Sequence, residues 1–533
     1  MRHWTRRLTA LLLAMCLLLT GCSFTEEFIE KMSIFGIATA YEDMEYTRPD
    51  MAKLQEALDN CSSLAQSTDS VDTLMKAVYA FYDEYDAFYT NSTLAEIRYS
   101  CDLTNLYWEE EYNFCSSQSP TAEAAVEQLF CTLAASPLRE ELEEMDYWGE
   151  GFFDAYDTEP SIDEPLLSLM EQETELINRY YGLDDRYTAA GYTLDDALFQ
   201  DMVSLYIQLI GVRQEIADYL GYPDYPTLAY DMYYARDYTP EEAAEYMTKL
   251  GEALYTPYTA LSDSDIWEQT YTYCPELETY RFLQTAAKAM GGIVADAFSY
   301  MDTNGLHHIL YGENKLNTSF ETYIWNYYAP FVFMNPYLDQ SDKLTFAHEF
   351  GHFAADYSCD GTFCGIDIAE THSMAMEYLC LCYGKDTELL TRYKLADSLC
   401  TYMEQSAYAM FEYQVYGLQD EDLTEENITE LYRQVGKQFG FDAFNWDPRE
   451  YVTVIHFFTD PMYTGSYVRS NDLAMQIYQL EQENSGDGLS LYKNILPSQD
   501  RYLLTFAETH NLESPFSQER LQSVAAFFQD TPF

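Results

Sequence analysis

Apolar residues recur three and four positions apart along most of the chain, a spacing that is typical of amphipathic helices. Polar runs at 90–93 and 116–120 interrupt it and predict helix breaks there. Farther on, a short hairpin is expected over 186–193, between two long helices. The same spacing predicts helices over 71–88, 122–133, 166–181, 194–220, 240–254, 276–301 and 464–480, with further helix between 383 and 438.

The period changes at 318–326 and 330–335, whose sequences TSFETYIWN and PFVFMN are rich in aromatic and β-branched residues. This composition predicts a pair of strands directly before the next helix. Such a strand can hold an extended peptide through main-chain hydrogen bonds. The alternative is a small hairpin with a purely structural role.

The segment 148–162 contains Gly149, Gly151, Pro160 and several acidic residues, and indicates a break between two lobes. Two lobes also suit a chain of 533 residues, since single cores seldom grow beyond ~250–300 residues. We therefore expect an N-terminal helical lobe over 51–160 and a larger domain over 161–530.

Acidic residues outnumber basic ones by 90 to 28, which gives a formal net charge of −62. A field of this sign repels the phosphates of nucleic acids, so a nucleic-acid partner is not expected. The simplest explanation of the charge is a solvated acidic surface.

The first 22 residues show how so acidic a chain could still sit at a membrane. Arg2, Arg6 and Arg7 precede an apolar run at 8–19 that is short for a membrane span, and Leu-Thr-Gly-Cys at 19–22 follows. This end resembles the lipobox of bacterial lipoproteins. The resemblance implies a signal peptide over 1–21, a diacylglycerol on Cys22, an anchored linker over 22–50 that leads into the first lobe, and an extracytoplasmic protein. An ordinary secretory signal or an uncleaved anchor are the alternatives.

The candidate chemistry lies in 341–383. His348, Glu349 and His352 form HEFGH, and residues four apart on a helix share one face, so both imidazoles can reach one cation. On the expected next helix, Glu370 and Glu377 share a stripe. Two imidazoles and one carboxylate are typical of catalytic zinc, with a fourth position left for water.

We therefore expect His348, His352 and Glu370 to bind one zinc ion. Glu377 is expected to orient a ligand imidazole, or else to be a solvated helix residue. Glu349 is suited to take the proton from the zinc-bound water and to pass it to the leaving amine. A structural zinc site and a chance motif without metal are the alternatives to this interpretation.

A later stretch, HFFTDPMYTGSY at 456–467, offers donors for the negative charge that develops on the attacked carbonyl. His456 and two following tyrosines, Tyr463 and Tyr467, are the candidates. Because the chain has 50 tyrosines, a structural role for each of them is the alternative.

Taken together, HEFGH, ETHSMAME at 370–377 and the stretch at 456–467 resemble the M3 metallopeptidases. The likeness is to the oligoendopeptidase F branch and, more distantly, to thimet oligopeptidase and neurolysin. It extends to RQEIADYLGYPDY at 213–225 and to the tail at 491–517.

The resemblance implies a predominantly α, two-lobed gluzincin fold of the neurolysin type, with a small β-sheet beside the zinc site and a deep substrate cleft. It implies a zinc endopeptidase acting on short unfolded peptides, with His348, His352 and Glu370 as ligands and Glu349 as the base. His456, Tyr463 and Tyr467 would be the transition-state donors.

Two other functions stay open at this point. A carboxypeptidase or dipeptidyl carboxypeptidase would shorten peptides from the C-terminus, because such zinc enzymes share HExxH and a downstream Glu. A peptide-binding lipoprotein that lost turnover would need neither Glu349 nor His456. Oligopeptides and the membrane are the expected partners, and the sequence does not indicate an oligomeric state.

Overall fold

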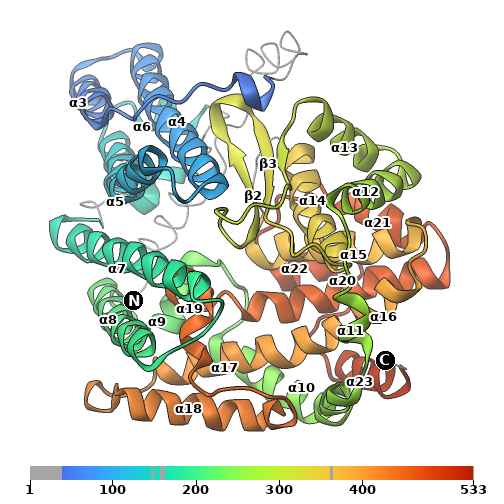
Figure 1. Ribbon diagram of the computed structural model, residues 1–533. Coiled ribbons are helices and arrows are strands. Elements are labelled where there is room, and N and C mark those ends of the chain that lie inside the picture. The colour runs from blue at the N-terminus through green and yellow to red at the C-terminus, as the bar shows by residue number, and fades with distance from the viewer. Residues whose placement is uncertain (1–38, 146–147, 149–150, 157–161, 360–363, 532–533) are drawn as a thin grey trace.

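The computed structural model describes residues 39–145, 148, 151–156, 162–359 and 364–531, and is mostly helical with one small sheet (Figure 1). The expected signal peptide at 1–21, Cys22 and most of the linker at 22–50 lie outside the described residues. Among the residues described, none of the helices is both long and apolar enough to cross a membrane.

Helices α3–α6 lie together at the upper left of Figure 1. They enclose a hydrophobic cluster of their own, drawn from residues between Leu54 and Tyr156, whereas the larger cluster contains most buried apolar residues from Ile162 onward. A domain boundary near 160 stays a prediction. These helices are α3 (Met51–Ser67), α4 (Val71–Cys101), α5 (Leu106–Ala134) and α6 (Arg139–Glu143).

The predicted breaks at 90–93 and 116–120 are wrong, because α4 and α5 run straight through both polar stretches. In α4 two of the polar side chains bond to the end of β2 (Ser319–Ile324) and to the turn that follows it. Thr90 Oγ1 accepts from the N–H of Asn326 at 2.8 Å, and Thr93 Oγ1 donates to the carbonyl of Tyr323 at 3.4 Å. The polar residues at 90–93 therefore mark a contact between α4 and the segment 323–326, not a break in the helix.

The predicted hairpin at 186–193 is also wrong. Helix α7 continues to Ala189 and ends where Gly191 and Tyr192 adopt φ of 65° and 59°, which leaves only a short turn before α8. The helix expected over 276–301 is divided in two, since Gly291 and Gly292 have φ of 66° and 59°, values that a right-handed helix excludes.

The remaining helices form the body of the molecule. They are α7 (Glu164–Ala189), α8 (Asp196–Leu220), α9 (Tyr225–Leu228), α10 (Pro240–Ala260), α11 (Ile266–Thr270), α12 (Glu276–Met290), α13 (Ile293–Thr303), α14 (Asp342–Cys359), α15 (Ile366–Tyr383), α16 (Glu388–Cys400), α17 (Ser406–Val415), α18 (Glu425–Gln438), α19 (Ile455–Thr459), α20 (Gly465–Glu483), α21 (Asp487–Ile495), α22 (Leu503–Thr509) and α23 (Gln518–Asp530).

The predicted strand pair is confirmed. β2 (Ser319–Ile324) pairs antiparallel with β3 (Ala329–Met334), and β1 (His307–His308) pairs in parallel on the other side, in the order β1-β3-β2. All six residues of β3 are buried, and β2 is an edge strand. The sheet lies against α14, which carries HEFGH (Figure 1).

Candidate active site

Helix α14 presents both histidines of HEFGH to a carboxylate on α15. His348 Nε2 lies 3.3 Å from Glu370 Oε2, and His352 Nε2 lies 3.7 Å from the same oxygen. The three potential ligand atoms all fall within 4.8 Å of one another. Two imidazole nitrogens and one carboxylate oxygen form the donor set of catalytic zinc sites, so these residues fit a zinc ion.

Gly351, inside HEFGH, allows the two helices to come this close. A Cβ atom at this position would lie 2.5 Å from the Cα of Ser373 and 2.8 Å from the carbonyl oxygen of His372, both backbone atoms of α15. Only glycine permits such an approach. Since the histidines flank Gly351 and Glu370 precedes this contact by one turn, the close packing brings the three candidate ligands together.

The electrostatics of Glu370 and His352 suit a cation. At His348, burial lowers the pKa, but hydrogen bonds to the two neighbouring carboxylates outweigh it and raise this pKa well above its ordinary value. Burial alone raises the pKa of Glu370, but the imidazoles of His352 and His348 and the Tyr463 hydroxyl outweigh it and lower this pKa to about 2. Burial lowers the pKa of His352 to about 4. An ionised carboxylate and a neutral imidazole are the forms that bind metal.

The other ring nitrogen of His348 contacts Glu377, and the predicted role of Glu377 in orienting an imidazole stays a prediction. The distance from Nδ1 to Oε1 is 2.9 Å. Glu377 is buried, and its second oxygen lies 2.7 Å from the ammonium of Lys394. Lys394 is itself buried and also pairs with Asp397 at 3.1 Å. This ammonium compensates a buried charge beside the three candidate metal ligands. No motif in the sequence points to Lys394, since it is a lysine on a separate helix, α16.

Glu349 lies between the two histidines in sequence and is 6% exposed. Burial raises its pKa to about 7, against the lowering effect of His348 and of the hydrogen bond from Ser319. Ser319 Oγ, at the start of β2, donates to Glu349 Oε1 at 2.8 Å. A carboxyl group with a pKa near neutrality is suited to accept and return a proton. Ser319 lies in a predicted strand, and no pattern in the sequence indicates that it reaches Glu349.

His456, Tyr463 and Tyr467 come together beside Glu370. The rings of His456 and Tyr463 stack with centroids 4.8 Å apart, and the Tyr467 hydroxyl lies 3.3 Å from His456 Nε2. The Tyr463 hydroxyl donates to Glu370 Oε1. Burial raises the pKa of both tyrosines well above its ordinary value, so both phenols remain protonated donors.

A cavity of about 540 Å³ adjoins the candidate active site. His348, Glu349, His456 and Tyr467 line it, whereas Tyr463 is not among the described residues that line it. Tyr467 is therefore better placed than Tyr463 to reach a bound substrate directly.

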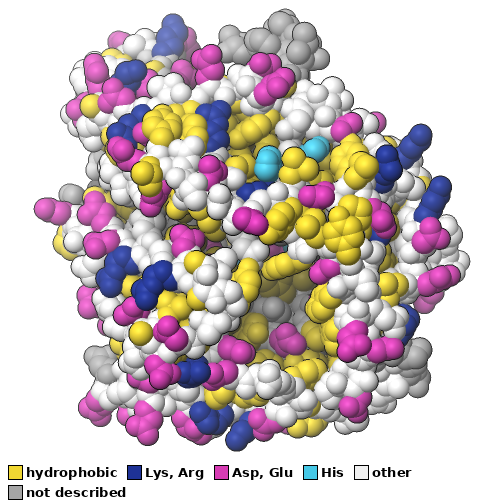
Figure 2. Space-filling view, in the orientation of Figure 1, with side chains coloured by type: hydrophobic (Ala, Val, Ile, Leu, Met, Phe, Trp, Pro, Cys, Tyr) yellow, Lys and Arg dark blue, Asp and Glu magenta, His cyan; other side chains and the backbone are white. Residues whose placement is uncertain are grey.

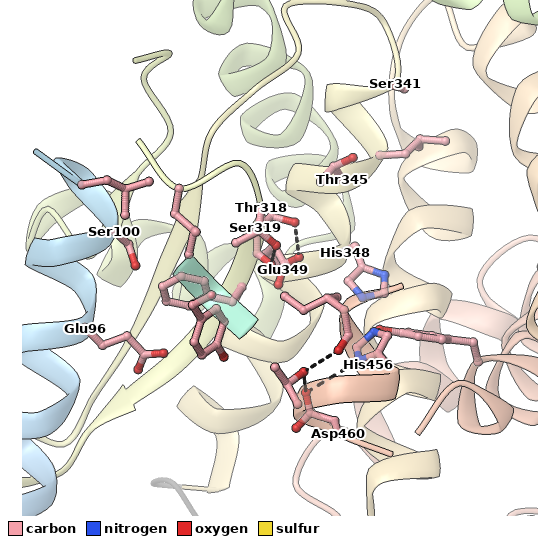
Figure 3. A pocket seen from close by; sticks show the side chains of 18 of the residues that line it. Glu96, Ser100, Thr318, Ser319, Ser341, Thr345, His348, Glu349, His456 and Asp460 are labelled. Atoms are coloured by element: carbon pink, nitrogen blue, oxygen red, sulfur yellow. Dashed lines mark hydrogen bonds and ion pairs between the residues drawn. The ribbon is translucent and has the colours of Figure 1, made fainter. Parts of the chain in front are cut away.

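The opposite wall of the cavity comes from the N-terminal half of the chain. Figure 3 shows Glu96 and Ser100 of α4 across the cavity from His348 and His456. Thr318, Ser319 and Phe320, at the beginning of β2, form one side. Among the described residues that line the cavity, none is Lys or Arg, and acidic side chains are also spread over the face in Figure 2.

Residues 41–160 match the family model of the Peptidase M3 N-terminal domain. No curated protein sequence matches the chain significantly. Two solved structures of proposed oligoendopeptidases F, one of them from Bacillus anthracis str. Ames, are 20% identical to this chain, with TM-scores of 0.78 and 0.76. Each alignment covers 92% of this chain and 98% of the solved chain. PZ peptidase A, solved with an inhibitor, is also 20% identical, with a TM-score of 0.78 over 92% of this chain and 99% of its own.

The chain thus has the fold of the oligoendopeptidase F structures, and its segment 41–160 is similar to the N-terminal domain of M3 peptidases. The resemblance to the oligoendopeptidase F branch and the mostly helical fold class with a small sheet, both predicted from the sequence, are confirmed.

Proposed function

We propose that the protein is a zinc-dependent endopeptidase that hydrolyses short unfolded peptides. The observation that carries the proposal is the convergence of His348, His352 and Glu370 within 4.8 Å of one another, next to a buried glutamate in a cavity beside an edge strand. The oligoendopeptidase-like fold supports the same conclusion.

In this proposal His348, His352 and Glu370 hold one zinc ion. When bound, zinc polarises the carbonyl of the scissile bond and lowers the pKa of water. Glu377 fixes the orientation of the His348 ring through Nδ1, which directs Nε2 toward the metal position. Lys394 keeps Glu377 ionised for this task, since burial alone raises the pKa of Glu377 and the ammonium then lowers it below its ordinary value.

Glu349 takes a proton from the attacking water and delivers it to the leaving amine. The bond from Ser319 holds one carboxylate oxygen, so the other stays available for the water. Tyr467 and His456 donate to the oxygen that becomes negative, and donors of this kind contribute roughly 10²–10³ in rate when they are well placed. Tyr463 donates a hydrogen bond to the carboxylate of Glu370 and so helps to keep this ligand ionised.

The edge of β2 is suited to bind the peptide backbone. Ser319 and Phe320 line the cavity next to Glu349, and a peptide that extends along β2 would place one of its carbonyls near the metal position. Main-chain recognition accepts many sequences, which suits an oligopeptidase.

We further propose that the protein acts outside the cytoplasmic membrane, held there by lipid on Cys22 after removal of residues 1–21. Mass analysis of the mature N-terminus tests this. A diacylated Cys22 in the wild type, and release of the protein from membranes by Cys22→Ser, are expected. An unmodified Cys22 would refute it.

Zinc content and hydrolysis of a peptide library by the full chain, compared with Glu349→Gln, test the activity. We expect about one zinc per chain in both proteins and a loss of ~10²–10⁴ in kcat for the variant. Internal cuts support the endopeptidase, and stepwise C-terminal shortening would replace it with a carboxypeptidase. Zinc binding without any cleavage would indicate a peptide-binding protein.

A further inference from the structure

Buried side chains hold the backbone of the turn that leads into the two candidate donor tyrosines. Tyr234 donates its hydroxyl hydrogen to the carbonyl of Pro461 at 2.8 Å, and Arg236 Nη2 donates to the carbonyl of Met462 at 3.1 Å. The N–H of Met462 donates to Glu412 Oε1 at 2.9 Å. Both peptide groups around Met462 are therefore fixed from outside the turn.

Met462 adopts φ of 69°. Residues with a side chain rarely adopt this left-handed region, because their Cβ atom then lies too close to the following carbonyl oxygen. Such a conformation persists only where the surroundings impose it, and it often marks a functional position. Here the result is that the next residue, Tyr463, has its hydroxyl on Glu370.

Arg236 also bonds to the other side of the turn. The same Nη2 donates to Ser466 Oγ at 2.8 Å, so one guanidinium nitrogen contacts the residues that directly precede Tyr463 and Tyr467. Its Nε lies 3.8 Å from Asp367, one turn before Glu370 on α15.

The surroundings keep this guanidinium in place. Arg236 is 8% exposed, and its Cζ lies 4.2 Å from the centre of the Tyr230 ring and 4.5 Å from that of Tyr234. The Tyr234 ring in turn meets Tyr463 edge-on, with centroids 6.1 Å apart. A planar guanidinium that packs against aromatic rings loses little conformational freedom when it forms two hydrogen bonds.

We infer that Arg236 is a positioning residue that fixes the turn at 461–466 against the metal-ligand helix and thereby aims Tyr463 and Tyr467. The inference rests on the proposed function. Because a shift of about 1 Å in a catalytic group can reduce the rate ~10²-fold, the arginine affects turnover without touching substrate or metal.

The first test compares Arg236→Gln and Arg236→Lys with wild type, using one internally quenched peptide that the wild type cleaves. We expect kcat to fall about 10–100-fold in Arg236→Gln, with KM changed less than about threefold and zinc content unchanged. Lysine keeps the charge but not the fork, so a partial rescue is expected. Arg433→Gln is the matched control, since Arg433 is a half-exposed arginine on α18 paired with Glu430, and its kcat should equal that of wild type.

Tyr234→Phe is a milder second variant in case Arg236→Gln does not fold. It removes only the bond to Pro461 and keeps the ring over Arg236. We expect a smaller loss in kcat, of about threefold to tenfold, and a Tm lowered by no more than about 2 °C, because one hydrogen bond is lost from a large protein.

The deciding experiment repeats Arg236→Gln in a Tyr463→Phe/Tyr467→Phe background. If the arginine acts through the tyrosines, its effect on kcat falls to less than about twofold there, because the interaction energy is shared. An equal loss in both backgrounds would show a general structural role and overturn the inference, as would a wild-type kcat in Arg236→Gln.

Binding of a phosphinic peptide, a mimic of the tetrahedral state, separates this inference from the proposed activity. Calorimetry on zinc-loaded protein should show weaker binding in Arg236→Gln by the same 10–100-fold as kcat. If the wild type cleaves no peptide, the proposed activity is wrong, and the loss of phosphinate affinity still decides the role of Arg236. A wild-type protein that neither cleaves nor binds overturns both.

Discussion

Glu377→Gln tests whether the carboxylate behind His348 supports the metal site. The substitution keeps the shape of the side chain and replaces an ionised acceptor by a neutral amide. It affects two contacts, the one to His348 Nδ1 at 2.9 Å and the one to Lys394 at 2.7 Å. The zinc affinity depends on the first contact and the stability on the second, so the two effects can be measured separately.

The expected loss in zinc affinity is ~10–100-fold, as for other partners of ligand imidazoles, which corresponds to ~1.4–2.7 kcal/mol. Breaking a buried ion pair from one side costs ~3–5 kcal/mol of unfolding free energy. Because Asp397 stays 3.1 Å from Lys394, we expect a stability loss at the lower end, about 3 kcal/mol.

Zinc affinity would be measured at neutral pH by competition with a chromogenic chelator, and stability by thermal unfolding of the metal-free proteins. Glu481→Gln is the matched control. Glu481 is a buried glutamate on α20 that accepts bonds from Tyr383 and two backbone N–H groups, so its loss should lower the Tm and leave zinc affinity unchanged. A zinc affinity of Glu377→Gln within twofold of wild type would refute the role of this carboxylate.

Three further predictions concern Ser319, the bound metal and Glu412. Ser319→Ala removes the bond to Glu349, and we expect kcat to fall about tenfold at constant zinc content; an unchanged kcat would contradict this. Removal of zinc with a chelator should lower the Tm, since a ligand at 100 times its Kd stabilises the native state by ~2.7 kcal/mol, and added zinc should restore it; an unchanged Tm would argue against a metal site.

Burial raises the pKa of Glu412 from 4.5 to about 8, against the N–H of Met462 and nearby arginines. The folded protein therefore keeps the proton on Glu412 up to a higher pH than the unfolded chain does. The stability that this proton contributes is fully present below the pKa of the unfolded chain and is lost as pH rises through the pKa of the folded protein. Because Gln stays neutral at every pH, the Tm of Glu412→Gln minus that of wild type should grow from about pH 5 to about pH 9. A pH-independent difference would show that this carboxyl does not titrate as inferred.

The sequence predicted the features that depend on local geometry. The spacing of His348 and His352 places both on one helical face wherever the helix lies, because i and i+4 are neighbours. Glu370 followed from the stripe on the next helix, and β2 and β3 from their aromatic and β-branched content. These properties do not depend on what packs against them.

The local sequence pattern led to a wrong prediction where polar side chains bond to residues that are distant in the chain. The polar residues at 90–93 do not break α4, because Thr90 and Thr93 bond to the segment at 323–326. Polarity in a sequence does not distinguish a loop from a helix that has polar neighbours, since only the fold supplies those neighbours.

Only the tertiary structure decides which contacts support the candidate active site. Gly351 sets the approach of α14 to α15, Ser319 reaches Glu349 from the sheet, Lys394 compensates Glu377, and Arg236 fixes the turn before Tyr463. Each contact joins segments far apart in the chain. A sequence motif records residues at fixed spacing, whereas the charge balance and the close packing around a metal site depend on which surfaces the fold brings together.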